Sequence, residues 1–271
     1  MNHESPTPIE VARQSLGSSD RAIYQRVART ARTLAPTPAG RFPRLIDVGC
    51  GQGLLWPFLR PFCDRYLGVD LVRYDTFPDD AEFLAADLNA QTIPLPSESA
   101  DLVVACETIE HLENPRQFAR ELTRLAAPDG IVIVTTPNQL SWLSKCTLLW
   151  KNQFNAFQDG GYPAHITALL EVDLLRIARE CGWMDIAIHY TDLGRVPGTP
   201  WHWPSTWPFR GRRFSDNVIL VGRKRPSSSG FPPDPRMSMI GPPSQQLHRA
   251  SGRFPPDPRM SMIGPPSQQL H

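Results

Sequence analysis

Short apolar runs separated by turn residues and amphipathic segments dominate the first 225 residues. Five runs are almost continuously apolar, which is typical of strands buried on both faces of a parallel sheet. They cover residues 44–48, 66–70, 82–86, 101–105 and 131–135. Apolar positions three or four residues apart predict helices between these strands. We expect helices at about 21–34, at 54–60, and from the Glu107 region onward, resuming at 115–126.

The C-terminal third of this region adds a helix and two further strands. A helix over 171–181 is expected to end at Gly182, and strands are expected at 185–190 and 217–221. The last strand follows its predecessor without a helical crossover, which predicts an antiparallel edge strand. The pattern therefore predicts an α/β fold with a doubly wound, mostly parallel, seven-stranded Rossmann-like sheet. In such sheets ligands bind beyond the carboxyl ends of the strands.

Composition changes abruptly after Arg225. The 18-residue segment FPPDPRMSMIGPPSQQLH occupies 231–248 and recurs unchanged at 254–271. Such a sequence lacks the apolar periodicity needed to form a core. We therefore expect a domain over 1–225, with its core in 40–225, and a disordered Pro-rich tail over 226–271. The tail is either a Pro-rich ligand for a partner domain or a recent duplication under little structural constraint.

Charge is nearly balanced, with 28 Lys+Arg against 27 Asp+Glu and a net charge of +1. This balance argues against nucleic-acid binding, which usually requires a strongly basic surface. The apolar runs are too short for a transmembrane segment, and the N-terminus lacks the basic start and apolar stretch of a secretory signal. The five cysteines form no CxxC pair, which predicts a reduced, cytoplasmic protein without zinc knots or disulfides.

The most informative segment is the glycine-rich turn Asp-Val-Gly-Cys-Gly-Gln-Gly at 47–53. Gly49, Gly51 and Gly53 would let the backbone approach a ligand closely. A dinucleotide-binding turn has the spacing G-x-G-x-x-G, whereas here the third glycine comes one residue early. This spacing disfavours a nicotinamide-dependent dehydrogenase.

Acidic residues end the next two predicted strands. Asp70 stands 70 − 49 = 21 positions after Gly49, where a carboxylate can accept hydrogen bonds from ribose hydroxyls. Asp87 ends the third strand. Because the carboxyl ends of parallel strands share one edge of the sheet, the glycine turn and both acids predict a nucleoside site.

With Asp47 before its first glycine, the turn resembles that of class I S-adenosylmethionine-dependent methyltransferases. Residues 100–107 and 110–115, followed by Thr-Thr-Pro-Asn at 135–138, are similar to the ubiquinone-type O-methyltransferases and their uncharacterised bacterial-type relatives, the type 11/23 groups. Asp129 stands where that group usually has glycine, in Pro-Gly-Gly. The resemblance implies S-adenosylmethionine as cofactor, with Asp87 at the adenine amine. The implied cofactor-binding residues are Asp47, Gly49, Cys50, Gly51, Gly53, Asp70, Leu71, Asp87, Leu88 and Cys106.

Candidate catalytic residues follow the fourth predicted strand. If the segment is helical, Glu107, Glu110 and His111 share one face, and His165 in the later irregular stretch could reach the same place. Glu110 and His111 could remove a proton from an oxygen acceptor. Alternatively, all four side chains could hold a divalent metal, which resembles the metal-dependent 2′-O-methyltransferases of small-RNA 3′ ends and the metal-assisted quinone-type enzymes. A third interpretation is that they only cap and brace a helix.

Two aromatic-rich insertions, 138–165 and 194–214, are expected to form the acceptor side. They suit a pocket for a ring-bearing or apolar acceptor, a peripheral membrane contact, or core packing under long loops. An amphipathic helix over 141–150 would serve any of these. We expect a methyltransferase acting on an oxygen of a small molecule or saccharide. The alternatives are a metal-dependent RNA 2′-O-methyltransferase and a catalytically silent, cofactor-binding regulatory protein.

Overall fold

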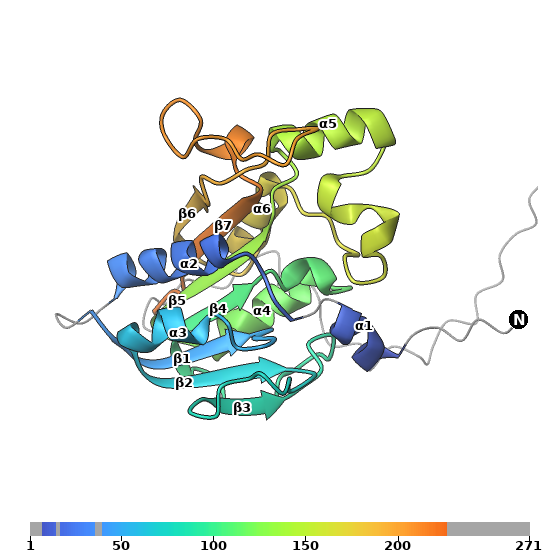
Figure 1. The fold of residues 1–271 in the computed structure, drawn as a ribbon. Coiled ribbons are helices and arrows are strands. Elements are labelled where there is room, and N and C mark those ends of the chain that lie inside the picture. Colours follow the sequence, from blue (N-terminus) through green and yellow to red (C-terminus); the bar gives the residue numbers. More distant parts are fainter. Residues whose placement is uncertain (1–6, 15–16, 36–39, 227–271) are drawn as a thin grey trace, which may run out of the picture. The chain divides into compact units, whose positions relative to one another are not determined.

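A single seven-stranded sheet forms the centre of the folded region (Figure 1). The computed structural model describes residues 7–14, 17–35 and 40–226, so the duplicated Pro-rich segments lie outside the described residues. The strand order is β3-β2-β1-β4-β5-β7-β6. The strands are β1 (Phe42–Val48), β2 (Cys63–Asp70), β3 (Glu82–Ala85), β4 (Ala100–Cys106), β5 (Ala126–Pro137), β6 (Met184–Tyr190) and β7 (Asn217–Arg223).

The predicted sheet is confirmed. Strands β1 to β5 are mutually parallel, and β7 is antiparallel to both of its neighbours, β5 and β6. The antiparallel strand is therefore inserted beside the edge strand β6. The order reverses between β1 and β4, and a ligand crevice is expected where the strand order reverses.

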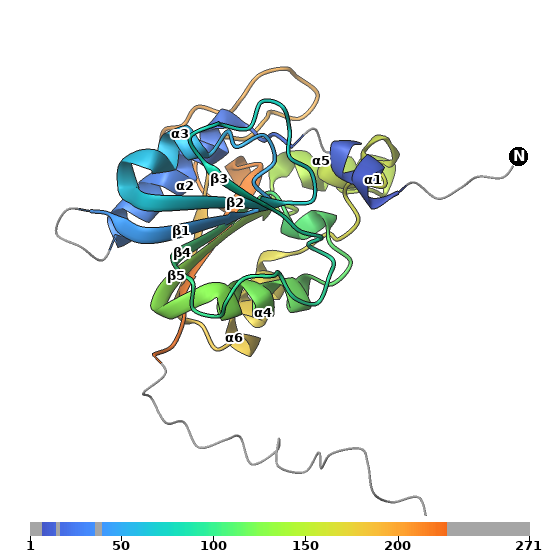
Figure 2. The ribbon, with the colours of Figure 1, turned by 90° about the horizontal axis from the view of Figure 1, so that it is seen from below.

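Helices cover both faces of the sheet, with α2 and α3 on one side and α4 and α6 on the other (Figure 2). Each face has its own cluster of buried apolar side chains, which is why the central strands are apolar on both sides. The helices are α1 (Pro8–Gln14), α2 (Arg21–Leu34), α3 (Trp56–Leu59), α4 (Pro115–Leu125), α5 (Trp142–Lys151) and α6 (Glu171–Glu180). Among the residues that the structure describes, none of these helices is long and apolar enough to cross a bilayer.

Several helices begin where the sequence places a capping side chain. Asp20 Oδ1 accepts a hydrogen bond from the Ala22 N–H (2.8 Å) at the start of α2. Ser141 Oγ accepts one from the Ser144 N–H (3.1 Å) at the start of α5. Each cap satisfies an N–H group that the helix itself leaves unpaired.

One local prediction was wrong, and two elements have other bounds than predicted. No helix starts at Glu107, because a 3₁₀ turn (Ile109–His111) follows β4 and Glu107 has a φ of +51°. The helix expected over 54–60 is confined to α3 and continues as a 3₁₀ turn through Pro61, whose ring disfavours further α-helix. The fifth strand, predicted from residue 131, begins already at Ala126, with an irregularity in its pairing with β4 and φ +60° at Asp129.

Candidate cofactor and metal site

A cavity of about 950 Å³ opens at the carboxyl ends of the parallel strands. Most of the predicted cofactor-binding residues line it, whereas Asp47 and Gly53 are not among its lining residues. The residues that do line it are Gly49, Cys50, Gly51, Asp70, Leu71, Asp87, Leu88 and Cys106. The volume is within the range of small-molecule and cofactor pockets, roughly 300–1,000 Å³.

The glycine turn is shaped by contacts with the protein itself. Gly49 has φ +79°, and a Cβ there would lie 2.2 Å from the Thr108 Oγ1. Gly51 has φ +51°, and a Cβ there would lie 2.2 Å from the Gly17 carbonyl oxygen. The sequence interpretation assigned these glycines to ligand approach alone. The structure shows that neighbouring segments of the chain also require them.

Asp70 links the turn to the end of β2. Its Oδ2 accepts a hydrogen bond from the Gly51 N–H (2.8 Å), and its Oδ1 accepts one from the Leu71 N–H (2.7 Å). Burial raises the pKa of this carboxyl. Each carboxylate oxygen has two lone pairs, so Asp70 retains acceptor capacity toward the cavity. Asp87 is exposed, and its Oδ1 accepts a hydrogen bond from the Asn89 N–H (2.9 Å).

Asp47 supports the turn from inside the protein. Its side chain is 1% exposed, and its Oδ2 accepts a hydrogen bond from the Tyr66 hydroxyl (2.8 Å). In the described part of the chain, Oδ1 has no hydrogen-bond partner. Burial raises the pKa of Asp47 to about 7. Asp47 therefore holds β1 against β2 and does not line the cavity.

Sequence reasoning missed a second wall of the cavity, the segment that leads into α2. Residues 17–20 and Tyr24 line the cavity, and the Gly17 carbonyl accepts a hydrogen bond from the Gln52 N–H (2.8 Å). The Tyr24 hydroxyl accepts a hydrogen bond from the Ser19 N–H (2.6 Å). The capping Asp20 was the only signal in the sequence, and it indicated a helix start rather than a cavity wall.

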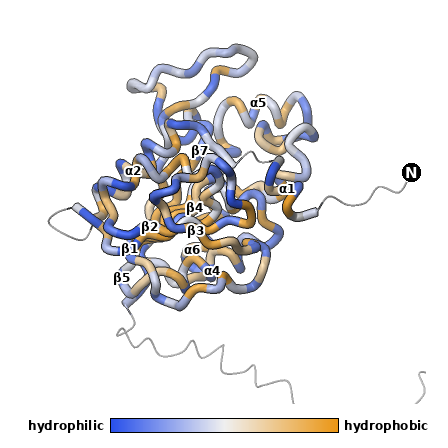
Figure 3. The backbone as a smooth tube through the Cα atoms, turned by 60° about the horizontal axis from the view of Figure 1, so that its bottom comes forward, coloured by the Kyte–Doolittle hydropathy of each residue, from blue (hydrophilic) through white to orange (hydrophobic). Residues whose placement is uncertain are grey.

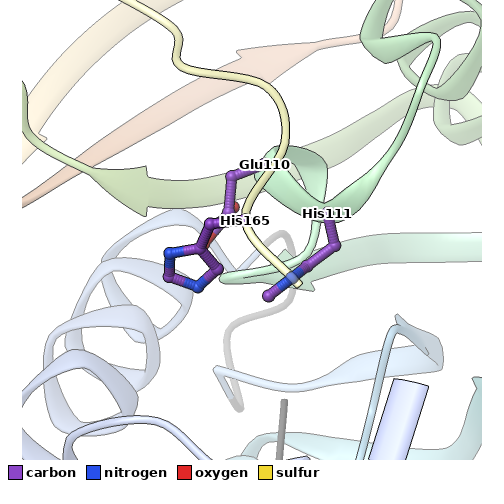
Figure 4. Close-up of side chains that lie close together, drawn as sticks. All are labelled: Glu110, His111 and His165. Atoms are coloured by element: carbon purple, nitrogen blue, oxygen red, sulfur yellow. The ribbon is translucent and has the colours of Figure 1, made fainter. Parts of the chain in front are cut away.

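Three of the four predicted metal ligands lie together (Figure 4). Glu110, His111 and His165 each offer one ligand atom, and these atoms lie within 4.8 Å of one another. His111 Nδ1 is 2.7 Å from the Ala164 carbonyl oxygen, and His165 Nδ1 is 2.6 Å from the Ala156 carbonyl oxygen. Because a carbonyl only accepts, each Nδ1 donates the hydrogen bond and carries a proton. Histidines that bind a metal through one ring nitrogen commonly donate the N–H of the other to a carbonyl in this way.

Glu110 is an unusual acid for the interior. It is fully buried, and within the described residues neither carboxyl oxygen has a hydrogen-bond partner of normal geometry. Burial, reinforced by the neighbouring Glu107, raises its pKa well above the ordinary value. Burial also lowers the pKa of His111 to about 4, so that imidazole is neutral at pH 7. An unpaired carboxyl with two imidazoles within 4.8 Å is a set of ligand atoms that suits a cation.

Glu107 lies apart from this group and is held by other bonds. Its Oε1 accepts a hydrogen bond from the Thr135 hydroxyl (2.7 Å), and its Oε2 accepts one from the Asn217 amide (2.7 Å). Burial raises its pKa to about 7. The predicted single face of Glu107, Glu110 and His111 does not form, because the segment is not an α-helix. Asn217 was not foreseen, since it lies 110 residues from Glu107 in the sequence.

The two insertions complete the cavity and separate the aromatic residues into two groups. Trp203 packs inside the second insertion, stacked on Phe209 (5.5 Å between ring centroids) and edge-on to Phe214 (5.2 Å). These three half-buried rings pack on one another and belong to neither of the two apolar clusters of the core. The tryptophans at 142, 150, 201 and 207 are exposed instead. Asn155, Tyr162, Arg195 and His202, from the same insertions, line the cavity.

The fold and this cavity define a class of α/β proteins that bind a nucleoside cofactor across the strand ends. The family model described as "Methyltransferase domain" matches residues 20–188. The chain belongs to this methyltransferase domain family, as the resemblance implied.

Curated relatives agree with the family. A probable S-adenosylmethionine-dependent methyltransferase of Mycolicibacterium smegmatis is 31% identical over 44% of this chain and 44% of that protein. One from Mycobacterium tuberculosis is 25% identical over 61% and 54%, respectively. The ubiquinone biosynthesis O-methyltransferase of Bradyrhizobium diazoefficiens is 31% identical over 37% and 42%. The chain thus spans about half the length of the curated relatives it matches.

Solved structures share the fold. A SAM-dependent methyltransferase from Archaeoglobus fulgidus has a TM-score of 0.54 at 15% identity, covering 80% of this chain and 100% of that chain. YcgJ from Bacillus subtilis has a TM-score of 0.51 at 16% identity, with coverage of 76% and 99%. At this identity the likeness shows the Rossmann-like methyltransferase fold alone.

Proposed function

We propose that the protein transfers a methyl group from S-adenosylmethionine to an oxygen of a small molecule or saccharide. The family assignment, the cavity at the strand ends and the half-buried Asp70 that lines it support the cofactor. S-adenosylmethionine, when bound, supplies a methyl group that its sulfonium has already activated. The protein's remaining tasks are to align the acceptor with that methyl group and to handle the acceptor's proton.

The cofactor side of the cavity suits a nucleoside. Asp70 would accept hydrogen bonds from the ribose hydroxyls, and Asp87 with Leu88 would contact the adenine. Gly49, Cys50 and Gly51 leave the floor of the cavity free of large side chains, and Leu71 and Cys106 flank it. Asp47 has a supporting role in this proposal, because its carboxyl bonds Tyr66 and is buried away from the cavity.

The observation that carries the proton-handling part is the unpaired carboxyl of Glu110 beside the Nε2 atoms of His111 and His165. We propose that these three residues hold a divalent cation, which would offset the cost of burying the Glu110 charge. A bound divalent cation lowers the pKa of an oxygen ligand. Carboxylate and imidazole donors suit first-row divalent metals. Glu107, which accepts hydrogen bonds from Thr135 and Asn217, would adjoin these three residues without itself binding the cation.

His111 acting alone as a general base is the weaker alternative. A general base is most effective when its pKa is near the working pH, and the pKa of His111 is lowered to about 4. A neutral imidazole with a fixed tautomer is well suited to ligate a cation. The proposal therefore places the acceptor hydroxyl near Glu110 and His111, with the proton leaving to water.

Glu110→Gln tests the proposal, with the exposed Glu113→Gln as its matched control. We expect Glu110→Gln to abolish Mn²⁺ binding in calorimetry and to lower methyl transfer by about 100-fold. Affinity for S-adenosylhomocysteine should stay within about twofold, which would show that the variant is folded. The transfer assay would use labelled S-adenosylmethionine with saccharide, phenolic and RNA acceptor pools.

Each proposal has its own contrary result. Unchanged Mn²⁺ binding and turnover in Glu110→Gln would contradict the cation site and the catalytic role of Glu110. Turnover that resists EDTA but is lost in His111→Ala would favour the base. Transfer only to RNA would replace the small-molecule acceptor, and tight cofactor binding without any transfer would favour a regulatory protein.

The location of the protein in the cytoplasm remains a prediction from the sequence.

A further inference from the structure

Large apolar side chains are exposed on both insertions. Leu149 and Trp150 at the end of α5 are 86% and 89% exposed, and Trp201 and Trp207 in the second insertion are 72% and 88% exposed. Tyr162, in the first insertion, is 74% exposed. Scattered exposed apolar residues are normal, but a group of this size points to an interaction surface. We call these five residues the aromatic surface.

The two insertions are neighbours in space. Arg213, from the second insertion, lies over the ring of Trp142 at the start of α5, 6.0 Å from the ring centroid. Asn138, just before α5, donates a hydrogen bond from its amide to the Arg212 carbonyl (2.6 Å). Figure 1 shows α5 and the loop that follows β6 on the same side of the molecule, beyond the ends of the strands. Figure 3 shows hydrophobic positions on α5, away from the core of the sheet.

Positive charge accompanies these apolar side chains. Residues 138–165 and 194–214 contain six Lys and Arg but one acid, Asp159, although the whole chain is nearly balanced. Arg195 pairs with Asp216, and Arg212 pairs with Glu171. Within the described residues the other four have no acidic partner. These four cations are Lys145, Lys151, Arg210 and Arg213.

We propose that the aromatic surface docks on an anionic lipid surface. Trp and Tyr side chains favour the boundary between headgroups and acyl chains, and Leu149 beside Trp150 would enter the apolar side of it. Unpaired Lys and Arg residues around such side chains are attracted by anionic headgroups. A protein partner would require a shape-complementary apolar face, whereas here the exposed rings are distributed over α5, the segment that follows it and the second insertion.

Docking would place the cavity opening near the lipid. Tyr162 belongs to the aromatic surface and also lines the cavity, and His202 lines the cavity next to Trp201. The same two insertions thus form both the cavity wall and the exposed surface. The docking itself does not depend on methyl transfer, so binding measurements test it separately from the proposed function.

Vesicle sedimentation with the full chain tests this proposal. We expect binding to phosphatidylcholine vesicles that contain phosphatidylglycerol, weaker binding without it, and a decrease with salt. Leu149→Ser should weaken binding by about tenfold, whereas Val172→Ser, an exposed apolar position on α6, should not change it. Lys151→Gln should weaken binding by about fivefold on the anionic vesicles alone. Arg29→Gln on α2 is its control.

Three results would overturn the proposal. The first is no sedimentation with either kind of vesicle. The second is equal weakening by Leu149→Ser and Val172→Ser, which would show that the surface is not specific. The third is a concentration-dependent dimer that Leu149→Ser dissociates while vesicle binding stays unchanged, which would assign the surface to a second copy of the chain. Unaltered affinity for S-adenosylhomocysteine in each variant confirms that the fold is intact.

Discussion

The cofactor side of the cavity and its acceptor side are built in different ways. The cofactor side uses the ends of β1 and β2, where backbone hydrogen bonds such as Gly49 N–H to Val69 O (2.7 Å) fix the turn. The acceptor side uses two long insertions joined by side chains, as in the bonds from the Asn138 amide to the Arg212 and Ser215 carbonyls. One side is therefore specified by the sheet, and the other by residues that can change without disturbing the sheet.

Because of this difference, the two sides of the cavity should tolerate different substitutions. On the cofactor side, glycine positions are enclosed by other parts of the chain, and Asp47 is buried beneath the turn. On the acceptor side, large side chains such as Trp207 are exposed. A fold organised in this way can keep one cofactor while its insertions vary with the acceptor, in keeping with the general separation of scaffold from functional loops.

The difference between the cofactor side and the acceptor side is tested most sharply by adding one methyl group to each. Gly51→Ala and Gly198→Ala both force alanine to a positive φ, +51° and +74°. At Gly51 the new Cβ would meet the Gly17 carbonyl at 2.2 Å, while at Gly198 nothing lies within 4 Å. We expect Gly51→Ala to lower the free energy of unfolding by about 3–5 kcal/mol and Gly198→Ala by about 1 kcal/mol.

Denaturant unfolding, followed by fluorescence, measures both variants. Gly51→Ala should also lose the thermal stabilisation that S-adenosylhomocysteine gives the wild type. Equal destabilisation by the two substitutions would show that the turn is not enclosed as described.

A smaller effect is expected from the buried acid beneath the turn. The pKa of Asp47 is raised to about 7 by burial, so the folded state binds a proton that the unfolded state releases above about 4. Stability of the unliganded protein should therefore fall as pH rises from about 4 to 7 and level off above that. Glu107 and Glu110, whose pKa values are also raised, contribute a slope of the same sign.

Asp47→Asn should remove part of this slope. We expect the variant to be more stable than the wild type at pH 8 by about 2–4 kcal/mol, because Asn can still accept the Tyr66 hydroxyl bond. The exposed Asp75→Asn serves as control, and urea unfolding at a series of pH values is the measurement. An unchanged pH profile in Asp47→Asn would mean that Asp47 is ionised in the folded protein.

The same contrast explains how far sequence could predict the molecule. The strands follow from short apolar runs, and the acids at positions 70 and 87 follow from strand ends that share one edge, whereas the order of the strands in the sheet comes from the structure. The partners of Glu107 could not be found, because Thr135 and Asn217 reach it from other strands. The supposed helix at 107–111 was misjudged, because tertiary bonds at Glu107 and Thr108 override the local pattern.

His111 and His165 could be predicted from the sequence only in part. His111 and His165 were named from the sequence, but their tautomers depend on the carbonyls of Ala164 and Ala156. Those contacts require the irregular path of the chain after α5, which has no periodic signal. The candidates could thus be predicted by residue type and strand-end position, whereas the exclusion of Glu107 from the group could not.

Calorimetric titration with S-adenosylhomocysteine tests the central claim most directly, that the strand ends around Gly49–Asp70 hold a nucleoside cofactor. The wild type should bind one equivalent, more tightly than nicotinamide cofactors, and Asp70→Ala should weaken binding by about 100-fold while the nearby Asp75→Ala leaves it unchanged. No saturable binding by the folded wild type, or equal affinity in Asp70→Ala, would contradict the account.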